Sequence, residues 1–418
     1  MTERHPDPQA LQRFAVGEVS TVESAEIERH LVVCTDCRDR VDEAVGRVSL
    51  PLFQWLGSDY DEALDRAVLG AAERLAGLRR EARGAEDLLA ELLREPEALR
   101  QGRIREDERF HSVKLCELLR TRGRERWLSD PAESLDLAEL AVGVAERLDP
   151  GRYGAMLVEN ARALSWAYLG NSLRLKSDLW RAEQAFKRSW GHHRSGGGDP
   201  YTEGELLFLT SSLRIVQSRS REAVRLTDQA AALYRAIGEV QSEGSALINK
   251  GLALSKAGLY EEAVEATRSG LLRSENSKDP HLLLAAKHNL VFFYLLQDDP
   301  EKAGRLLVEL RSLYDETAKG ALPVRLWWVE GRFAGHLGRF TDAESHLIEV
   351  RDFFLDLDLG IELFYAALDL AELYARSGRP RQVRETLGEV IPLGEALGLR
   401  RETLMARLLY EQASRASR

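Results

Sequence analysis

The chain has 418 residues, a formal net charge of −10 and a composition dominated by Leu, Ala, Glu and Arg, which favours helix. An acidic chain lacks the basic face that phosphate contacts require, so we predict no direct nucleic-acid partner. The N-terminus has no apolar core of a signal peptide, and the longest apolar run, residues 290–296, is too short to span a membrane. Only three cysteines are present, which argues against a disulfide framework. We expect an all-α cytoplasmic protein.

Residues 1–45 contain the one stretch that suggests specific chemistry. His30 and Cys34 are four residues apart and would share one face of a helix, and Cys37 follows three residues later. Imidazole and thiolate are ligand types that zinc prefers, and structural zinc sites have four ligands. His5 is the best candidate for the fourth ligand, because the prolines that follow it keep its segment extended. The pattern predicts one structural Zn²⁺ held by His5, His30, Cys34 and Cys37.

Two alternatives for the cysteine pair stay open, a redox dithiol and unrelated exposed thiols. Two short helices are predicted before the pair, at residues 7–17 and 20–33, and no strand precedes it as in a thioredoxin motif. A catalytic zinc ion would need a coordination position open to water, and no neighbouring residue resembles a general base. We therefore expect no enzymatic activity. Such a small unit has almost no core, so the metal would supply much of its folding free energy.

The combined pattern, H-P-x-P near the start and H-x-x-x-C-x-x-C at residues 30–37, resembles the zinc-binding anti-sigma-factor family. His30, Cys34 and Cys37 match its motif directly, and His5 matches its upstream ligand. The resemblance implies a small helical module that binds a sigma factor and, in some members, thiols that sense oxidation. Many members also carry a transmembrane segment, which we do not find in this sequence.

Residues 46–106 are predicted to form a helical linker, with an amphipathic helix over residues 59–83. The basic run at residues 100–105 is followed at once by acidic residues, so we interpret it as a solvated, salt-bridged face. Residues 107–150 are predicted to form a degenerate first helical pair, because terminal repeats are usually atypical.

Residues 151–418 contain an internal repeat of about 40 residues. A small or apolar residue recurs where two helices would cross: Ala182, Ala223, Ala263, Ala303, Ala343 and Val383. Five residues before each of these lies a turn former: Ser177, Ser218, Gly258, Asp298, Gly338 and Gly378. Twelve residues before each, a mostly small residue recurs: Gly170, Ser211, Gly251, Val291, Gly331 and Ala371. The period predicts an α-solenoid of about six helical hairpins with one continuous core. It ends at residues 402–418 in an amphipathic helix with a polar, Arg-tipped tail, which we expect to be the solubilising cap.

The repeat resembles the tetratricopeptide repeat family, including the aromatic residue or proline that opens the second helix, as at Tyr260 and Pro300. Its period is longer than the usual 34 residues. The resemblance implies a concave surface lined by the first helix of each hairpin, which binds a protein or peptide. Positions that would face this surface, with two basic residues beyond them, are Tyr168, Asn171, Arg174, Asn249, Leu252, Lys256, Asn289, Phe292 and Arg332. Alternatively, these side chains only contact neighbouring helix ends or solvent.

Two non-enzymatic functions are consistent with these features. The first is a protein–protein interaction scaffold or adaptor, in which the solenoid binds a protein or peptide and the zinc module is structural or a second binding site. The second is a transcription regulator, in which the zinc module binds a sigma factor and the solenoid senses a signal. A zinc hydrolase is the third and least favoured, because it needs an exchangeable metal-bound water. No oligomeric state is predicted.

Overall fold

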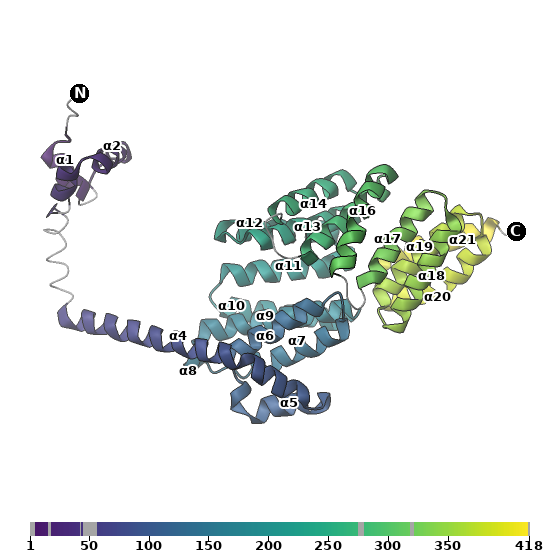
Figure 1. Ribbon diagram of the computed structural model, residues 1–418, viewed down its shortest axis with the longest axis horizontal. Coiled ribbons are helices and arrows are strands. Elements are labelled where there is room, and N and C mark those ends of the chain that lie inside the picture. The colour runs from purple at the N-terminus through teal and green to yellow at the C-terminus, as the bar shows by residue number, and fades with distance from the viewer. Residues whose placement is uncertain are drawn as a thin grey trace. The chain divides into compact units, whose positions relative to one another are not determined.

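The computed structural model describes residues 5–15, 18–41, 43–44, 57–274, 280–317 and 322–416. Within these ranges all regular secondary structure is helical, which confirms the predicted all-α class (Figure 1). The chain divides into two compact units, Met1–Gly77 and Leu78–Arg418. None of the described helices meets the combined length and hydropathy requirement of a bilayer span.

The first unit contains α1 (Pro8–Ala15), α2 (Thr21–Val33) and a further helical stretch at residues 35–41. The Ser20 hydroxyl accepts a hydrogen bond from the Glu23 amide at 3.3 Å and so caps α2. Four buried apolar side chains form its core: Leu11, Ile27, Cys37 and Val41. Such a core is too small to fold a domain of this size without another source of free energy.

The second unit begins within the long helix α4 (Gly57–Arg94), inside the segment predicted to be a linker. The elements that follow are α5 (Glu97–Glu106), η1 (Glu108–Phe110), α6 (Val113–Arg126), α7 (Pro131–Ala145) and α8 (Pro150–Tyr153). Leu92 and Ile104 are fully buried with Phe110 and Leu119 in one core. The end of α4 and all of α5 therefore pack as part of this unit.

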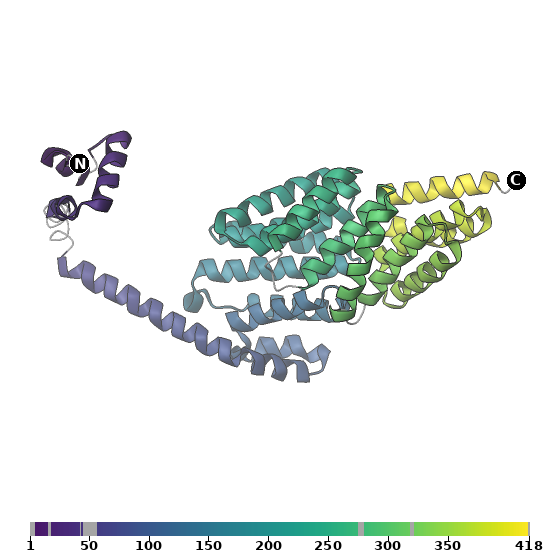
Figure 2. The same ribbon diagram turned by 45° about the horizontal axis from the view of Figure 1, so that its top comes forward.

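Six helical hairpins and one final helix make up the rest of the unit (Figures 1 and 2). The hairpins are α9 (Ala155–Leu175) with α10 (Leu179–Ser195), α11 (Pro200–Val216) with α12 (Ser220–Ile237), α13 (Val240–Lys256) with α14 (Tyr260–Ser274), α15 (Pro280–Leu296) with α16 (Pro300–Thr317), α17 (Leu322–His336) with α18 (Phe340–Asp356), and α19 (Gly360–Arg376) with α20 (Pro380–Ala396). The final helix is α21 (Arg400–Ala416). The predicted solenoid of about six repeats is thereby confirmed.

Each hairpin has two steric requirements that produce the repeat pattern. One is a small or apolar residue where the two helices cross, and the other is a turn residue that tolerates positive φ. All six crossing residues are fully buried, and all six turn formers have positive φ, including Ser177 at 63°, Ser218 at 57° and Asp298 at 57°. At Gly251, a Cβ would lie 2.0 Å from the Thr267 hydroxyl oxygen, so only glycine fits this helix crossing. A second series of positive-φ residues lies in the turn after a hairpin, at Gly198, Gly238, Asp358 and Gly398.

The final helix has one buried and one exposed face, as expected of the amphipathic helix that the sequence predicts. α21 packs on one side through Ala406 and Ala413, but Leu404 and Leu408 on its other side are 58% and 53% exposed.

Candidate functional site

The fold brings the four predicted zinc ligands together. His30 lies in the last turn of α2, Cys34 caps that helix, and Cys37 lies in the next helical turn. His5 approaches from the segment before α1, with its Nδ1 at 3.5 Å from Cys34 Sγ and 3.3 Å from Cys37 Sγ. One ligand atom from each residue lies within 4.8 Å of all the others. Arg38 donates to the Leu31 carbonyl at 2.8 Å and ties the Cys37 turn to α2.

These residues fit a zinc ion. Ligand atoms of a tetrahedral zinc site lie roughly 3.3–3.8 Å apart when metal–ligand distances are about 2.0–2.3 Å, and both measured separations fall in that range. His30 Nε2 is buried and has no hydrogen-bond partner among the described residues. A buried nitrogen of this kind is costly unless it is bonded, and a metal bond would satisfy it. Burial and the adjacent Cys34 raise the pKa of the Cys37 thiol, and a divalent cation would favour the thiolate instead.

A second cluster lies where the first helices of the hairpins face one another. Arg332 on α17 donates to Asp369 Oδ2 on α19 at 2.9 Å, and its guanidinium carbon lies 4.2 Å from the centre of the Phe292 ring on α15. Trp328 donates to the same Asp369 oxygen at 2.6 Å. Two of the predicted partner-binding residues, Phe292 and Arg332, therefore meet on one surface.

Two more predicted residues place incompletely paired cations on this surface. Lys256 Nζ lies 3.9 Å from the centre of the Tyr365 ring, and burial lowers the pKa of Lys256 to about 8 despite the opposing charge of Glu402. Arg174 donates twice to Asn171 Oδ1, at 3.0 and 2.9 Å, and burial lowers the pKa of Arg174 to about 10. In both cases the charged form loses hydration that its protein partners do not fully replace.

Sequence reasoning missed three residues of this surface. Arg325 Nη2 donates to Glu362 Oε1 at 3.4 Å, yet Arg325 Nε and Glu362 Oε2 are buried and unpaired within the described ranges. His288 Nδ1 lies 3.1 Å from the Tyr314 hydroxyl, and burial lowers the pKa of His288 to about 3. A signal existed for Arg325, which precedes Arg332 by two helical turns and so shares its face.

We call this set the inner cluster: Arg174, Lys256, His288, Phe292, Arg325, Arg332, Glu362, Tyr365 and Asp369. Glu372 on α19 is exposed, yet burial and the neighbouring Asp369 raise its pKa. Glu372 therefore lies beside the inner cluster, near Asp369 and Arg332.

The other predicted partner-binding residues lie apart from the inner cluster or contribute little accessible surface. Tyr168 is buried and donates to Glu205 Oε2 at 3.3 Å. Asn249 donates to the hydroxyls of Ser211 and Ser212, at 2.7 and 3.1 Å, and so joins α13 to α11. Leu252 and Asn289 are half-buried, and Leu252 packs against the apolar core. The alternative interpretation, contact with neighbouring helices, therefore describes Tyr168 and Asn249.

The first two hairpins of the solenoid contact the last hairpin and the final helix. Ser177 Oγ accepts a hydrogen bond from the Ile361 amide at 2.9 Å, and Ser218 Oγ donates to Glu402 at 2.7 Å. Lys176 Nζ donates to the Leu357 carbonyl at 3.0 Å. The two serines occupy equivalent turns, and each contacts a residue 184 positions later. The C-terminal hairpins therefore dock in register on the N-terminal turns, beside the inner cluster.

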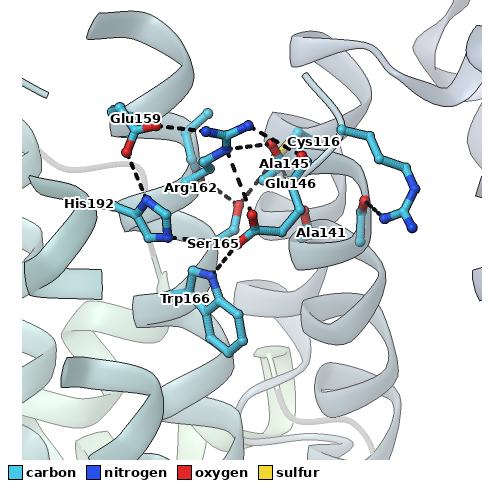
Figure 3. Close-up of polar contacts among 12 residues, drawn as sticks. Cys116, Ala141, Ala145, Glu146, Glu159, Arg162, Ser165, Trp166 and His192 are labelled. Carbon is cyan, nitrogen blue, oxygen red and sulfur yellow. Dashed lines mark hydrogen bonds and ion pairs between the residues drawn. The ribbon is translucent and has the colours of Figure 1, made fainter. Parts of the chain in front are cut away.

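A separate polar network joins α9 and α10 to the end of α7 (Figure 3). His192 Nδ1 lies 2.8 Å from Glu159 Oε2, and Arg162 donates to the other Glu159 oxygen at 2.7 Å. Trp166 donates to Glu146 at 2.7 Å. Cys116, also drawn, is fully buried and lies 3.2 Å from the Ser165 hydroxyl. These groups satisfy one another, so we interpret the network as structural.

Comparisons with known proteins support the fold. No protein-family model and no curated protein matches the chain. A Rap protein complexed with competence and sporulation factor matches 82% of this chain and 97% of its own, with a TM-score of 0.53 and 12% identity. Aspartyl phosphate phosphatase F from Bacillus subtilis matches 95% of this chain and 97% of its own, with a TM-score of 0.51 and 13% identity. The likeness places the chain among tetratricopeptide-type helical repeat solenoids.

Proposed function

We propose that the solenoid is a regulatory adaptor that binds an acidic peptide or protein segment against the inner cluster. The observation that carries this proposal is the incomplete pairing of buried cations: burial lowers the pKa of both Arg174 and Lys256. A ligand carboxylate would supply the missing counter-charge as a charge-assisted hydrogen bond. The similar Rap protein was solved with a bound factor, which supports ligand binding by this fold.

The inner cluster also offers the contacts that an extended segment needs. Phe292 and Tyr365 provide aromatic surface beside the cations Arg332 and Lys256. We therefore expect a ligand that alternates acidic and apolar side chains.

A random peptide library panned on the full chain tests this proposal. We expect the panning to enrich peptides rich in Asp and Glu. The affinity of a labelled enriched peptide for the chain is then measured by fluorescence anisotropy. Arg332→Ala combined with Lys256→Ala should weaken that binding at least about tenfold, which corresponds to about 1.4 kcal/mol. Arg305→Ala, at an exposed position on α16, is the matched control and should leave the affinity for the peptide unchanged. Enrichment of neutral or basic peptides would contradict the proposal. So would a double variant that binds the enriched peptide as tightly as the unaltered chain does.

The same peptide should bind in a pH-dependent manner. Because burial lowers the pKa of Lys256 to about 8, its positive charge is present at pH 7 and is lost as the pH rises through 8. We expect the affinity for an acidic peptide to fall between pH 7 and pH 9. Lys256→Arg, which keeps its charge over this range, should flatten the profile. An unchanged profile in this variant would remove Lys256 from the binding surface.

For the first unit we propose one structural zinc ion, held by His5, His30, Cys34 and Cys37. The orphaned nitrogen of His30 and the short separations of His5 from the two sulfurs support it. These groups would hold the metal with both sulfurs as thiolates and without an open position. The ion would order α1 and α2 around it.

The transcription-regulator alternative uses this zinc module as the binding surface. Its test is capture of purified sigma factors by the full chain and by a Cys34→Ser variant. Capture that is lost with the metal site supports the alternative. Absence of capture, or capture that the variant retains, rejects it and leaves the adaptor proposal intact.

A further inference from the structure

A cavity of about 460 Å³ lies at the start of α12. It is lined by residues 218–222, which include the turn before α12 and the first turn of that helix, by Ala257 after the end of α13, and by Arg401 in α21. Three of these lining residues are arginines and only one, Glu222, is acidic. Small-molecule sites commonly have volumes of about 300–1,000 Å³, so the cavity is large enough to hold a small anion.

The first turn of α12 offers backbone N–H groups that have no acceptor within the described ranges. Ala223 is the first residue of this helix whose amide bonds inside the chain, to the Arg219 carbonyl at 3.0 Å. Arg219 occupies the N-cap position and makes no side-chain cap. One repeat earlier, Asp178 fills this position and accepts from the Arg181 amide at 2.9 Å. Uncapped amides and the helix dipole together favour an anion at the start of α12.

A buried hydroxyl in the same turn also lacks a partner. Ser220 lines the cavity and is only 8% exposed, and its Oγ has no hydrogen-bond partner among the described residues. Leaving a buried hydroxyl unbonded is costly, so such groups are normally satisfied by protein, water or ligand. This hydroxyl is independent of the helix dipole, and it indicates a ligand that accepts hydrogen bonds.

Two of the lining arginines keep guanidinium N–H groups that can reach a ligand. Arg221 is exposed and has no hydrogen-bond or ion-pair partner in the part of the chain that the structure describes. Arg401 donates through Nη1 to the Lys256 carbonyl at 2.7 Å. That bond fixes the guanidinium beside the cavity and leaves its other N–H groups to donate.

The acidic residues near the cavity do not cancel this positive charge. Glu222 is paired with Arg219, and Arg214 Nε lies 3.0 Å from the other oxygen of the same carboxylate. Glu402 accepts from the Ser218 hydroxyl at 2.7 Å, is 7% exposed and does not line the cavity. The two remaining arginines therefore set the charge that a ligand meets.

We propose that this cavity binds a phosphate group through the first amides of α12, the Ser220 hydroxyl and the guanidinium groups of Arg221 and Arg401. A phosphate group has enough oxygens to accept from all three kinds of donor, whereas a carboxylate has only two. The cavity is larger than a phosphate ion, so it has room for a small organic group attached to the phosphate. This proposal does not depend on the peptide-binding function.

Phosphorus NMR of inorganic phosphate in the presence of the full chain, at constant ionic strength, tests the proposal. Exchange with the cavity should broaden the phosphate signal, and Arg221→Ala should weaken the binding about tenfold, because a charge-assisted hydrogen bond is lost. Arg225→Ala, at an exposed position one helical turn further along α12 and outside the cavity lining, is the matched control and should bind as the unaltered chain does. Absence of broadening, or equal binding by the two variants, overturns the proposal.

Glycerol phosphate in place of inorganic phosphate identifies the source of the phosphate group. Tighter binding of glycerol phosphate supports a phosphorylated metabolite as the ligand, because the organic group then contacts the rest of the cavity. Equal or weaker binding supports the free ion.

Ser220→Ala tests the unpartnered hydroxyl. Because its Oγ has no partner in the described chain, the variant should melt at the same temperature as the unaltered chain, or slightly higher, when phosphate is absent. Phosphate raises the melting temperature of a chain that binds it, and this rise should be smaller in the variant. A lower melting temperature without phosphate, or an undiminished rise with it, removes Ser220 from the site.

Discussion

The two units of the chain differ in what holds them together. In the first, the buried apolar core is confined to Leu11, Ile27, Cys37 and Val41, and two of the four proposed zinc ligands border it or belong to it. In the second, each hairpin buries its own crossing residue and adds to cores that continue through successive repeats. Metal ligation can therefore order a segment that stacking cannot, because a few strong bonds replace a large buried area.

The largest expected effect comes from removing the metal ligands. In Cys34→Ser combined with Cys37→Ser, the zinc content should fall from one ion per chain to none, and the helices of the first unit should unfold. The thermal transition of the solenoid should stay where it is, because its cores contain none of these residues. Metal analysis and circular dichroism measure the two effects.

The third cysteine provides the matched control. Cys116 is fully buried between α6 and the following helices, so Cys116→Ala should cost the second unit about 1–2 kcal/mol and leave the zinc content unchanged. Zinc retained by the double variant, or lost from Cys116→Ala, would break the contrast between the two units.

A smaller effect tests stacking within the solenoid. Gly251→Ala places a methyl group 2.0 Å from the Thr267 hydroxyl and 2.8 Å from the Ala263 carbonyl, so α13 and α14 must separate. We expect a loss of about 1–3 kcal/mol in the free energy of unfolding, measured with urea. Gly84→Ala, in the middle of α4 with open space around it, should instead gain up to about 1 kcal/mol. Effects of the same sign at both positions would contradict this description of the repeat.

The inner cluster makes the stability of the second unit depend on pH. Burial lowers the pKa of His288 from 6.5 to about 3, so between these values the unfolded chain binds a proton that the folded chain does not. The stability that neutral His288 contributes is complete above pH 6.5 and is lost as the pH falls towards 3. His288→Asn should reduce the acid sensitivity of urea unfolding over this range. An identical slope in the variant would show that His288 is solvated.

The smallest expected effect lies in the positive-φ turns of the solenoid. Asp358 has φ of 53°, a conformation that costs an ordinary residue about 1 kcal/mol relative to glycine. Asp358→Gly should therefore raise the melting temperature slightly, and Gly338→Ala, at φ of 72°, should lower it. Calorimetry distinguishes the two signs, and a decrease for both would contradict the steric argument.

The sequence could predict those features that restrict a position to a few residue types. The repeat was visible because six equivalent turns need a residue that tolerates positive φ, which restricts Ser177, Gly258 and their equivalents to a few residue types. The four proposed zinc ligands could be predicted because few types of side chain bind zinc. Contacts such as Ser177 with Ile361 depend on how much each hairpin rotates on the next, a small angle that no local pattern encodes. His288 was missed because the face of α15 was assigned one residue too late, at Asn289.

Hydrogen exchange on the full chain, before and after chelation of zinc, tests most directly the claim that metal orders the first unit and stacking orders the second. Chelation should remove protection from residues 5–44 and leave residues 155–416 unchanged. Protection that persists at residues 5–44 without metal, or that is lost in both units together, would contradict the claim.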